Sequence, residues 1–319
     1  MTYILSLLKK QEQNVNRDDH FYDGFYHMKN EPFTLKNLNR FDTLAVGWLL
    51  LSAIFSAVFI QKEITYFYIS TGHLLFIATI IILSNHHHRY GISGLFRFGY
   101  PLILITVVHW EIEPFLHQIY GEGVNFDVVV KNWDQNFFGN PHLNWHKSMP
   151  CLFWVELFHF FYMTYYPLLI GSILWIWRRR FHDIERFAFV YMAIFLSYVS
   201  FYLLFPVFGP LDYRSTLFQN EGILPGFVDF LFTVGAPDGA AFPSSHVGQS
   251  VGVFLLLQPL KRKMNILILT CIIGIGLSMV YISIHYAIDA LSGLITGTLL
   301  YYLWNRIYKI MPVKGSSPD

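Results

Sequence analysis

The sequence predicts an all-α membrane protein, a bundle of about eight transmembrane helices. Of its 319 residues, 54% are hydrophobic and 13% are charged, whereas a soluble domain carries about 25% charged residues. The hydrophobic residues also occur in runs of roughly 20, the length that crosses a bilayer as a helix. We therefore expect membrane lipids around the protein and no nucleic acid as a partner, while the sequence leaves the oligomeric state open.

Eight apolar segments are long enough to be candidate spans. The third, 99–117, contains His109, Glu111 and Glu113, so composition alone does not decide whether it crosses the bilayer. We expect these three residues to line a headgroup cavity near its outer end. The candidates are 43–61, 64–84, 99–117, 151–177, 187–208, 244–260, 264–284 and 287–307.

The distribution of Lys and Arg decides the topology. With eight spans, 18 of the 22 basic residues lie on the side of the N-terminus, whereas without a crossing at 99–117 the split is 11 to 11. Cytoplasmic loops carry the Lys/Arg excess, so we expect eight spans and both termini in the cytoplasm. The basic residues on the other side are Lys62, Lys131, Lys147 and Arg214.

This topology divides the chain into regions. Residues 1–42 form a cytoplasmic N-terminal segment, and 43–117 hold the N-terminal transmembrane helices. We expect residues 118–308 to form the membrane core that carries the catalytic residues described below, and 309–319 to form a cytoplasmic tail. The core begins with an outer loop, 118–150, which is rich in Trp, Phe and Asn and is expected to lie at the outer interface, where Trp is favoured.

Two stretches carry the residues suited to chemistry: Ala241–His246 (AFPSSH) and Ile284–Asp289 (IHYAID). In the second, Asp289 follows His285 by four residues, one helical turn, so its carboxylate can reach the imidazole. The short turn Lys261–Lys263 joins the two corresponding spans as an antiparallel hairpin. We therefore expect both stretches to meet at one site on the outer face, where it opens sideways to lipid.

The residue types indicate phosphoryl transfer. Ser244 and Ser245 after Pro243 are typical of a helix start, which binds anions through its N–H groups, although simple capping explains them equally well. His246 lies just inside a span, where a histidine side chain costs free energy unless it has an interaction partner or a function. A carboxylate bonded to one ring nitrogen of His285 fixes the tautomer and leaves the other nitrogen free to attack phosphorus.

These residues resemble the signatures of the type 2 phosphatidic acid phosphatase superfamily. Pro243–His246 is similar to the signature P-S-G-H. Ser278-Met279, five further residues, His285, three more and then Asp289 are similar to S-R-x5-H-x3-D. The resemblance covers roughly residues 120–305, and it implies a six-helix membrane core with no metal and no other cofactor.

The resemblance also implies a role for each residue. His285 is the nucleophile, Asp289 is its orienting partner, and His246 is the general acid on the leaving oxygen. Ser244 and Ser245 hold the phosphate. A phosphohistidine forms first, and His246 then activates the acceptor. Water as the acceptor makes a phosphatase, and a lipid or sugar hydroxyl makes a transferase.

The departures from the family pattern resemble one branch. Met279 stands where the third signature has arginine, and Val207 and Ser215 replace the lysine and proline of the first signature, K-x6-R-P. The remaining loop, Phe205–Arg214, resembles that of the inositolphosphotransferase branch, which includes fungal inositol phosphorylceramide synthases. Arg214 is then the main cationic phosphate contact, and its planar fork suits two phosphoryl oxygens. The resemblance to this branch also includes Phe126-Asp127, Asp134, Phe138-Gly139 and Tyr162.

The low positive charge bears on the substrate, which we expect to be a lipid phosphate or a phospholipid. A phosphate monoester carries up to two negative charges and a diester carries one. A site with few cations favours the diester, and hence headgroup transfer, as a hypothesis.

Two other functions stay open. A polyprenyl-diphosphate phosphatase has the same core motifs, because these motifs do not encode the lipid. A lipid transporter or flippase belongs to a different class and performs no covalent chemistry. Intramembrane Glu and His residues are typical of transporters, but the sequence shows neither an internal repeat nor paired broken helices. Replacing His285 with alanine distinguishes an enzyme from a transporter. The enzyme would stop forming its covalent product, whereas a transporter forms none.

Two further pairs of residues have an expected packing role. Glu156 and His159, three residues apart on one helical face, are expected to form a buried hydrogen-bonded pair that lines the site, with metal binding as the alternative. Gly293 and Gly297 form a small-xxx-small pattern, which predicts close helix packing in a membrane.

Overall fold

The protein is α-helical throughout the part of the chain that its structure describes. In this computed structural model, the described residues are 35–59, 61–85, 92–121, 123–218, 222–235 and 237–312. Among them there is no strand, only an isolated bridge between Val207 and Ala240. The prediction of an all-α membrane bundle is confirmed. Most of the predicted segments 1–42 and 309–319 lies outside the described residues.

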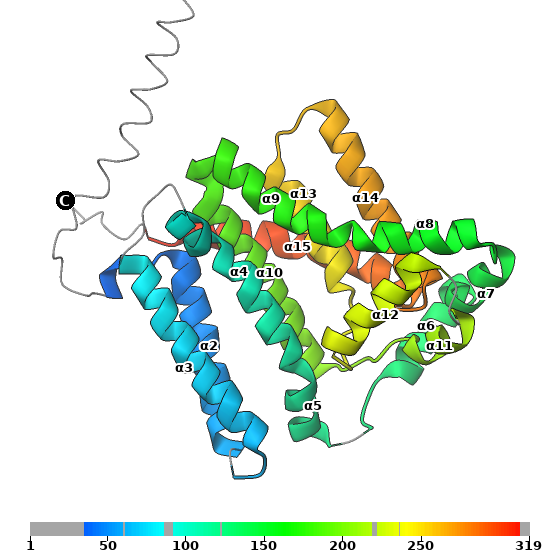
Figure 1. Cartoon of the computed structure of the whole chain (residues 1–319), viewed down its shortest axis with the longest axis horizontal. Helices are drawn as coiled ribbons and strands as arrows, with labels where there is room; N and C mark the ends of the chain where they lie inside the picture. The colour runs from blue at the N-terminus through cyan, green and yellow to red at the C-terminus, as the bar shows by residue number, and fades with distance from the viewer. Residues whose placement is uncertain are drawn as a thin grey trace, which may run out of the picture.

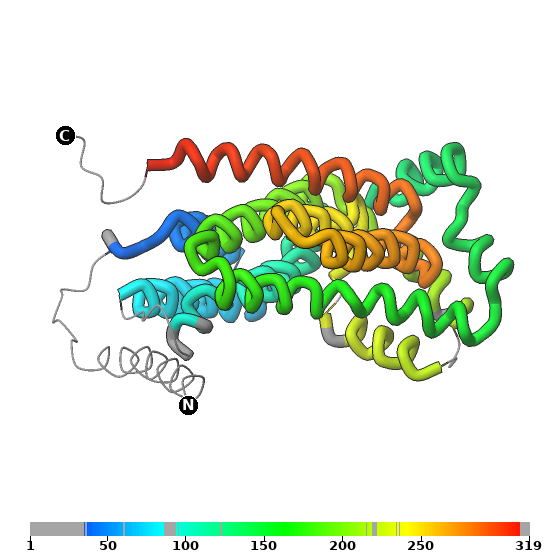
Figure 2. The backbone as a smooth tube through the Cα atoms, turned by 90° about the horizontal axis from the view of Figure 1, so that it is seen from above, coloured from blue at the N-terminus to red at the C-terminus, as the bar shows by residue number. Residues whose placement is uncertain are grey.

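The long helices pack side by side as a bundle, and the short helices α6, α7, α11 and α12 gather at one end of it (Figures 1 and 2). The helices are α2 (Arg40–Phe59), α3 (Ile64–Asn85), α4 (Ile92–Trp110), α5 (Ile112–Tyr120), α6 (Asp127–Phe138), α7 (Pro141–Ser148), α8 (Leu152–Met163), α9 (Tyr165–Arg179), α10 (Ile184–Leu204), α11 (Leu211–Leu217), α12 (Ile223–Gly235), α13 (Ser245–Leu257), α14 (Arg262–Tyr281) and α15 (Ala287–Ile310).

Six helices of the described residues are long and apolar enough to cross a membrane, so the predicted count of about eight is not confirmed. Two expected spans are not among the six: 99–117, which is divided between α4 and α5, and 244–260, which corresponds to α13. Helix α13 has 13 residues, or about 20 Å of helix, which is shorter than the ~30 Å hydrocarbon core. The expected span 151–177 is broken at Thr164 into α8 and α9, which together form one 28-residue candidate. The six are α2, α3, α8 with α9, α10 with the preceding turn, α14 and α15.

The end of the bundle opposite the short helices is held by arginines. Arg40 at the start of α2 donates a hydrogen bond to the carbonyl of Met311 after α15, at 2.9 Å. Arg180 after α9 donates to the carbonyls of Leu257 and Gln258 after α13, at 2.8 and 3.1 Å. The starts and ends of helices far apart in sequence therefore meet here.

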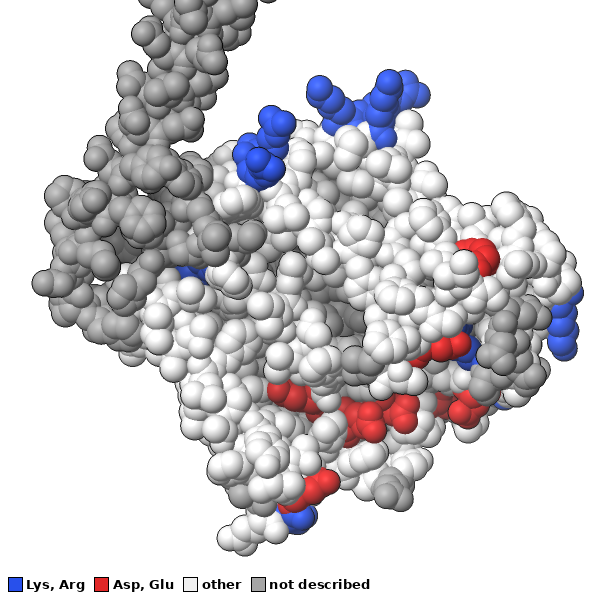
Figure 3. Space-filling view, viewed as in Figure 1, with Lys and Arg blue, Asp and Glu red and all other residues white. Residues whose placement is uncertain are grey.

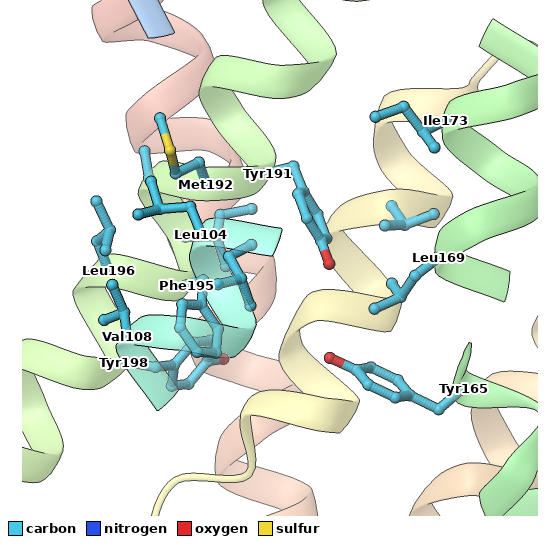
Figure 4. Close-up of a cluster of buried hydrophobic side chains, with 14 of the residues drawn as sticks. Leu104, Val108, Tyr165, Leu169, Ile173, Tyr191, Met192, Phe195, Leu196 and Tyr198 are labelled. Atoms are coloured by element: carbon cyan, nitrogen blue, oxygen red, sulfur yellow. The ribbon is translucent and has the colours of Figure 1, made fainter. Parts of the chain in front are cut away.

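Helix α10 lies at the centre of the bundle, with 72% of its most apolar stretch buried. Figure 4 shows Leu104 and Val108 of α4 close to Phe195 of α10, and Tyr191 of α10 directed toward α13 and the side of α9 that carries Leu169. A helix that is apolar on all sides is buried, and α10 is the central helix against which the other helices pack.

Helices α13 and α15 approach closely through glycines. A Cβ atom on Gly293 would lie 2.4 Å from the carbonyl oxygen of Ser244, and one on Gly297 would lie 2.5 Å from the Cα of Gly248. The predicted small-xxx-small packing is confirmed. This contact brings the N-terminal ends of the two helices together, and these ends carry both sequence stretches suited to chemistry.

Candidate active site

His285 and Asp289 lie at the start of α15 and contact each other as their spacing predicts. His285 Nδ1 lies 3.3 Å from Asp289 Oδ2, and both side chains are buried. The same carboxylate oxygen accepts the backbone N–H of Tyr286 at 2.8 Å. With Nδ1 facing a carboxylate, the proton belongs on Nδ1, and Nε2 is left with a free lone pair.

Ser244, at the start of α13, faces this nitrogen, and His246 lies nearby. Ser244 Oγ lies 3.4 Å from His285 Nε2, and the centroids of the His246 and His285 rings are 6.2 Å apart. The ring of His246 packs against that of Tyr165, with centroids 4.4 Å apart. The structure thus brings the two histidines and the first serine together. Ser245 is also buried, with its N–H facing α10.

Three hydrogen bonds that the sequence did not predict fix the start of α13. The Tyr202 hydroxyl of α10 donates to the carbonyl of Pro243 at 2.8 Å and accepts the N–H of Ser245 at 3.1 Å. The N–H of Ser244 donates to the carbonyl of Asp289 at 3.0 Å. Tyr202 stands in a long aromatic run, so no local signal distinguishes it from a packing residue.

Met279 occupies the neighbourhood where the family signature has an arginine. Its side chain is fully buried, and its sulfur accepts a hydrogen bond from Ser244 Oγ at 3.4 Å. A neutral thioether therefore stands directly beside the serine that faces His285 Nε2. The site lacks one positive charge at this position.

Arg214 of α11 lies beside the turn that precedes His285, but its guanidinium is already engaged. Its Nε and Nη2 atoms donate to Asp229 Oδ1 of α12, at 2.8 and 2.7 Å. Its Nη1 donates to the carbonyl of Ile282 at 3.0 Å, and its Nη2 lies 3.1 Å from Nε2 of His159. These contacts commit four of the five N–H donors of an arginine. A phosphate that uses both arms of this fork must displace Asp229.

The expected pairing of Glu156 with His159 is wrong. His159 Nδ1 lies 2.6 Å from the carbonyl of Val155, so its Nε2 is the acceptor for Arg214. Glu156 instead accepts the N–H groups of Ile223 and Leu224, at 2.6 and 3.3 Å. A carboxylate suits a helix N-terminus, which has unpaired N–H groups and a positive dipole end. Both residues hold α12 and Arg214 in place, although they do not bond to each other.

Asp127 clamps the loop that leads into α11. Its carboxylate oxygens accept the N–H groups of Phe208 and Gly209, each at 2.8 Å. Gly209 has φ +82°, and a Cβ atom there would lie 2.8 Å from the carbonyl oxygen of Ile284. The loop is thereby pressed against the residue before His285. Burial raises the pKa of Asp127, although the two N–H donors act in the opposite direction.

A cavity of about 340 Å³ opens beside His246. Figure 4 shows Tyr165 and Tyr191, two of its lining residues, with their hydroxyl ends directed into the space beside α13. Its volume lies in the range of about 300–1,000 Å³ typical of ligand pockets, and its wall is predominantly apolar. Its lining includes His109, Tyr162, Tyr165, Leu169, Phe195 and Phe232.

The three residues expected to line a headgroup cavity separate in the structure. His109 lines the cavity beside His246. Glu111 instead contacts His73 at 2.5 Å and accepts a hydrogen bond from Ser52 at 3.3 Å, on the side of α2 and α3. Glu113 lies near a much smaller pocket. The expectation of one shared headgroup cavity is therefore wrong.

The comparison with known protein families agrees with this geometry. Residues 134–303, more than half of the chain, match the model of the PAP2 superfamily. The chain belongs to this superfamily. The match includes both histidines and Asp289, and members of the superfamily generally have phosphatase activity. No curated protein and no solved structure matches the chain significantly.

Proposed function

We propose that this PAP2 superfamily member is a lipid phosphatase or phosphotransferase that works through a phosphohistidine on His285. The observation that carries the proposal is the meeting of His246 and His285 beside the apolar cavity. The two rings are 6.2 Å apart, which leaves room for a phosphoryl group between them. The cavity beside His246 suits the hydrocarbon chain of a lipid, whose phosphate then reaches the histidines.

The proposed reaction has two steps. In the first, His285 Nε2 attacks phosphorus, the bond from phosphorus to the leaving oxygen breaks, and His246 gives its proton to that oxygen. In the second, the acceptor oxygen attacks phosphorus, its proton passes to His246, and the phosphorus–nitrogen bond breaks. Asp289 stabilises the positive imidazole of the intermediate. The oxygens of the transition state are stabilised by Ser244 and by the N-terminal end of α13.

The charges around His285 favour a phosphate that carries one negative charge. Met279 is neutral, and Arg214 forms an ion pair with Asp229, so the site offers little net positive charge for a dianion. A monoanionic diester, such as the headgroup linkage of a phospholipid, suits it better. This supports transfer of a headgroup, in the manner of the inositolphosphotransferase branch, over hydrolysis of a monoester.

The basic residues favour an active site on the outer face. Figure 3 shows Lys and Arg gathered along one edge of the molecule, where α9 and α14 carry Arg178–Arg180 and Lys261–Lys263 at their ends. The histidines lie at the other end of α13 and α15. By the positive-inside rule, the basic edge faces the cytoplasm together with both termini, and the site faces the periplasm or an organelle lumen.

Phosphorus NMR tests the proposal. The purified protein and its His285→Ala variant are incubated in EDTA with phosphatidic acid, a polyprenyl diphosphate, and phosphatidylinositol with ceramide. We expect a new phosphodiester signal from the wild type only. Inorganic phosphate from the wild type only would instead establish a phosphatase and overturn the preference for a diester. Equal rates of product formation by the wild type and His285→Ala would contradict the role of His285. The absence of product from both proteins would favour the transporter.

A further inference from the structure

The segment formed by α6 and α7 supports the catalytic turn from outside the core helices. The Ser283 hydroxyl donates to the carbonyl of His142 at 3.0 Å. The Tyr281 hydroxyl donates to the carbonyl of Met149 at 2.7 Å. Both donors come shortly before His285. The outer loop predicted to lie at the interface therefore also holds the nucleophile's own turn.

Asp134 of α6 reaches the other side of that turn. Its side chain is fully buried, and its Oδ1 accepts the N–H of Ile288 at 3.0 Å. Ile288 is the second residue of α15, and the N–H groups of a first helical turn have no partner within their own helix. Asp134 thus caps α15 from another helix, one residue before Asp289.

The first turn of α15 is consequently held by two carboxylates. Asp289 Oδ2 accepts the N–H of Tyr286, and Asp134 accepts the N–H of Ile288. Both carboxylates lie at the positive end of the helix dipole, which stabilises them. Among the described residues, Asp289 is also the group that contacts His285 Nδ1. The orientation of the nucleophile therefore depends on how firmly this turn is held.

His142 of α7 lies next to Asp134. It is fully buried, its Nδ1 lies 3.4 Å from Asp134 Oδ2, and its ring packs edge-on against that of Tyr286, with centroids 5.1 Å apart. His142 Nδ1 and Asp134 Oδ2 thus face each other at ion-pair distance, and His142 Nε2 has no hydrogen-bond partner among the described residues. This contact joins α7 to the carboxylate that holds the first turn of α15.

We propose that Asp134 is a positioning residue for His285: its carboxylate fixes the first turn of α15 and so holds Asp289 against Nδ1 of the nucleophile. The interaction at Oδ1 accounts for burying a carboxylate on a peripheral helix. It also explains why α6 belongs to the site although it carries no reacting group.

Two substitutions at Asp134 separate the hydrogen bond from the charge. Asp134→Ala removes the acceptor for the Ile288 N–H, and Asp134→Asn keeps an acceptor oxygen without the charge. We expect the alanine variant to lower kcat by about 10–100-fold, the usual effect of losing a partner that orients an active group, with KM within about twofold. We expect the asparagine variant to recover most of this loss.

The tautomer of His285 gives a readout that does not need a substrate. Protein labelled with 15N in its 14 histidines is measured by NMR, and the His285 signal is assigned from a His285→Ala sample. We expect the Nδ1–H tautomer in the wild type and in Asp134→Asn. We expect a mixture of tautomers in Asp134→Ala. Only the kcat readout rests on the proposed function, so an inactive protein with this tautomer pattern would count against that function alone.

Asp42 provides the matched control. It is another fully buried carboxylate, at the opposite end of the bundle, and it contacts Arg97 and Tyr100. Asp42→Asn should lower stability without changing the His285 tautomer. If Asp134→Ala does not fold, Ile288→Pro deletes the N–H donor instead, because proline is tolerated in a first helical turn. The proposal is overturned if the variant that removes the hydrogen bond keeps the wild-type tautomer, or if Asp134→Asn is as damaging as alanine.

Discussion

The two halves of the site are held by different kinds of contact. The histidine half rests on buried contacts, among them two between backbones: Ser244 N–H bonds to the carbonyl of Asp289, and Gly293 lets α13 and α15 touch. The arginine half includes an exposed contact, because Arg214 is paired with Asp229, whose side chain is 49% exposed on α12. His285 is thus held by buried groups, whereas Arg214 has a partner that solvent or a ligand can reach.

This difference indicates that the two halves have different functions: one keeps the histidines in place, and the other binds and releases phosphate. A nucleophile and its acid must keep their geometry through both steps, and backbone contacts between packed helices provide that rigidity. A phosphate-binding cation must release one anion to accept another. An ion pair that is partly exposed is worth little free energy, so Asp229 is suited to exchange for a phosphate.

Replacement of the histidines gives the largest expected effect and separates their roles. His285→Ala removes the nucleophile, so no phosphohistidine forms and turnover falls to background. His246→Ala removes the general acid and slows turnover by about 10²–10⁴-fold, but an ester with an acidic leaving group should still label His285. The measurement is trapping of 32P-labelled protein under alkaline conditions, in which phosphohistidine is stable. Labelling of His285→Ala at the wild-type level would contradict the assignment.

Replacement of Arg214 gives the next largest effect. Arg214→Ala removes a donor to the transition-state oxygens, which typically costs about 10²–10³-fold in rate, and it also leaves Asp229 without its partner. The measurement is kcat/KM on the ester that the wild type turns over. Arg180→Ala is the control, because Arg180 bonds to an aspartate and to backbone carbonyls at the opposite end. A loss of less than threefold for Arg214→Ala would make Arg214 a structural residue.

The two halves also differ in how many of their contacts can be predicted from the sequence. His285 and Asp289 are four residues apart, so their contact could be predicted from local geometry, although His285 lies in the bend before α15 and Asp289 reaches back to it from the first helical turn. Gly293 and Gly297 indicate a close helix contact for the same reason. The meeting of His246 and His285 could be predicted because a short turn joins α13 to α14, after which His285 follows. Tyr202 and Asp134 contact the same half from distant parts of the sequence and have no such signal.

The partners in the arginine half come from different elements and have no sequence signal. Asp229 lies 15 residues after Arg214 in another helix, and Glu156 lies 67 residues before the N–H of Ile223 that it caps. The sequence assigned Glu156 to His159 because the two share a helical face. In the structure, each instead bonds to a group on another element. The predicted number of spans is not confirmed, because α13 is apolar like its neighbours but has only 13 residues.

Adding one carbon at the α13–α15 contact tests the rigidity of the histidine half. In Gly293→Ala, the new Cβ atom would meet the carbonyl of Ser244 at 2.4 Å, so the helices must separate. We expect a loss of about 1–3 kcal/mol in the free energy of unfolding, as for other overpacked sites, and a lower kcat. Gly171→Ala in α9 is the control: its Cβ atom would meet nothing within 4 Å, and it should be neutral or stabilising. Equal effects of the two substitutions on unfolding and on kcat would show that the contact does not position the site.

Removal of the charge on Asp229 gives the smallest effect and tests the exchange directly. Asp229→Asn frees Arg214 for phosphate, so KM should fall a few-fold with kcat nearly unchanged, and the gain should be larger for a dianionic monoester than for a monoanionic diester. Glu156→Gln is the matched control, because it weakens the other anchor of α12 and leaves the charge of Arg214 compensated. Kinetics on a paired monoester and diester of the same lipid measure both variants. If Asp229→Asn raises KM for both esters, as Glu156→Gln would by loosening α12, then Asp229 holds the helix and does not tune the charge of the phosphate site.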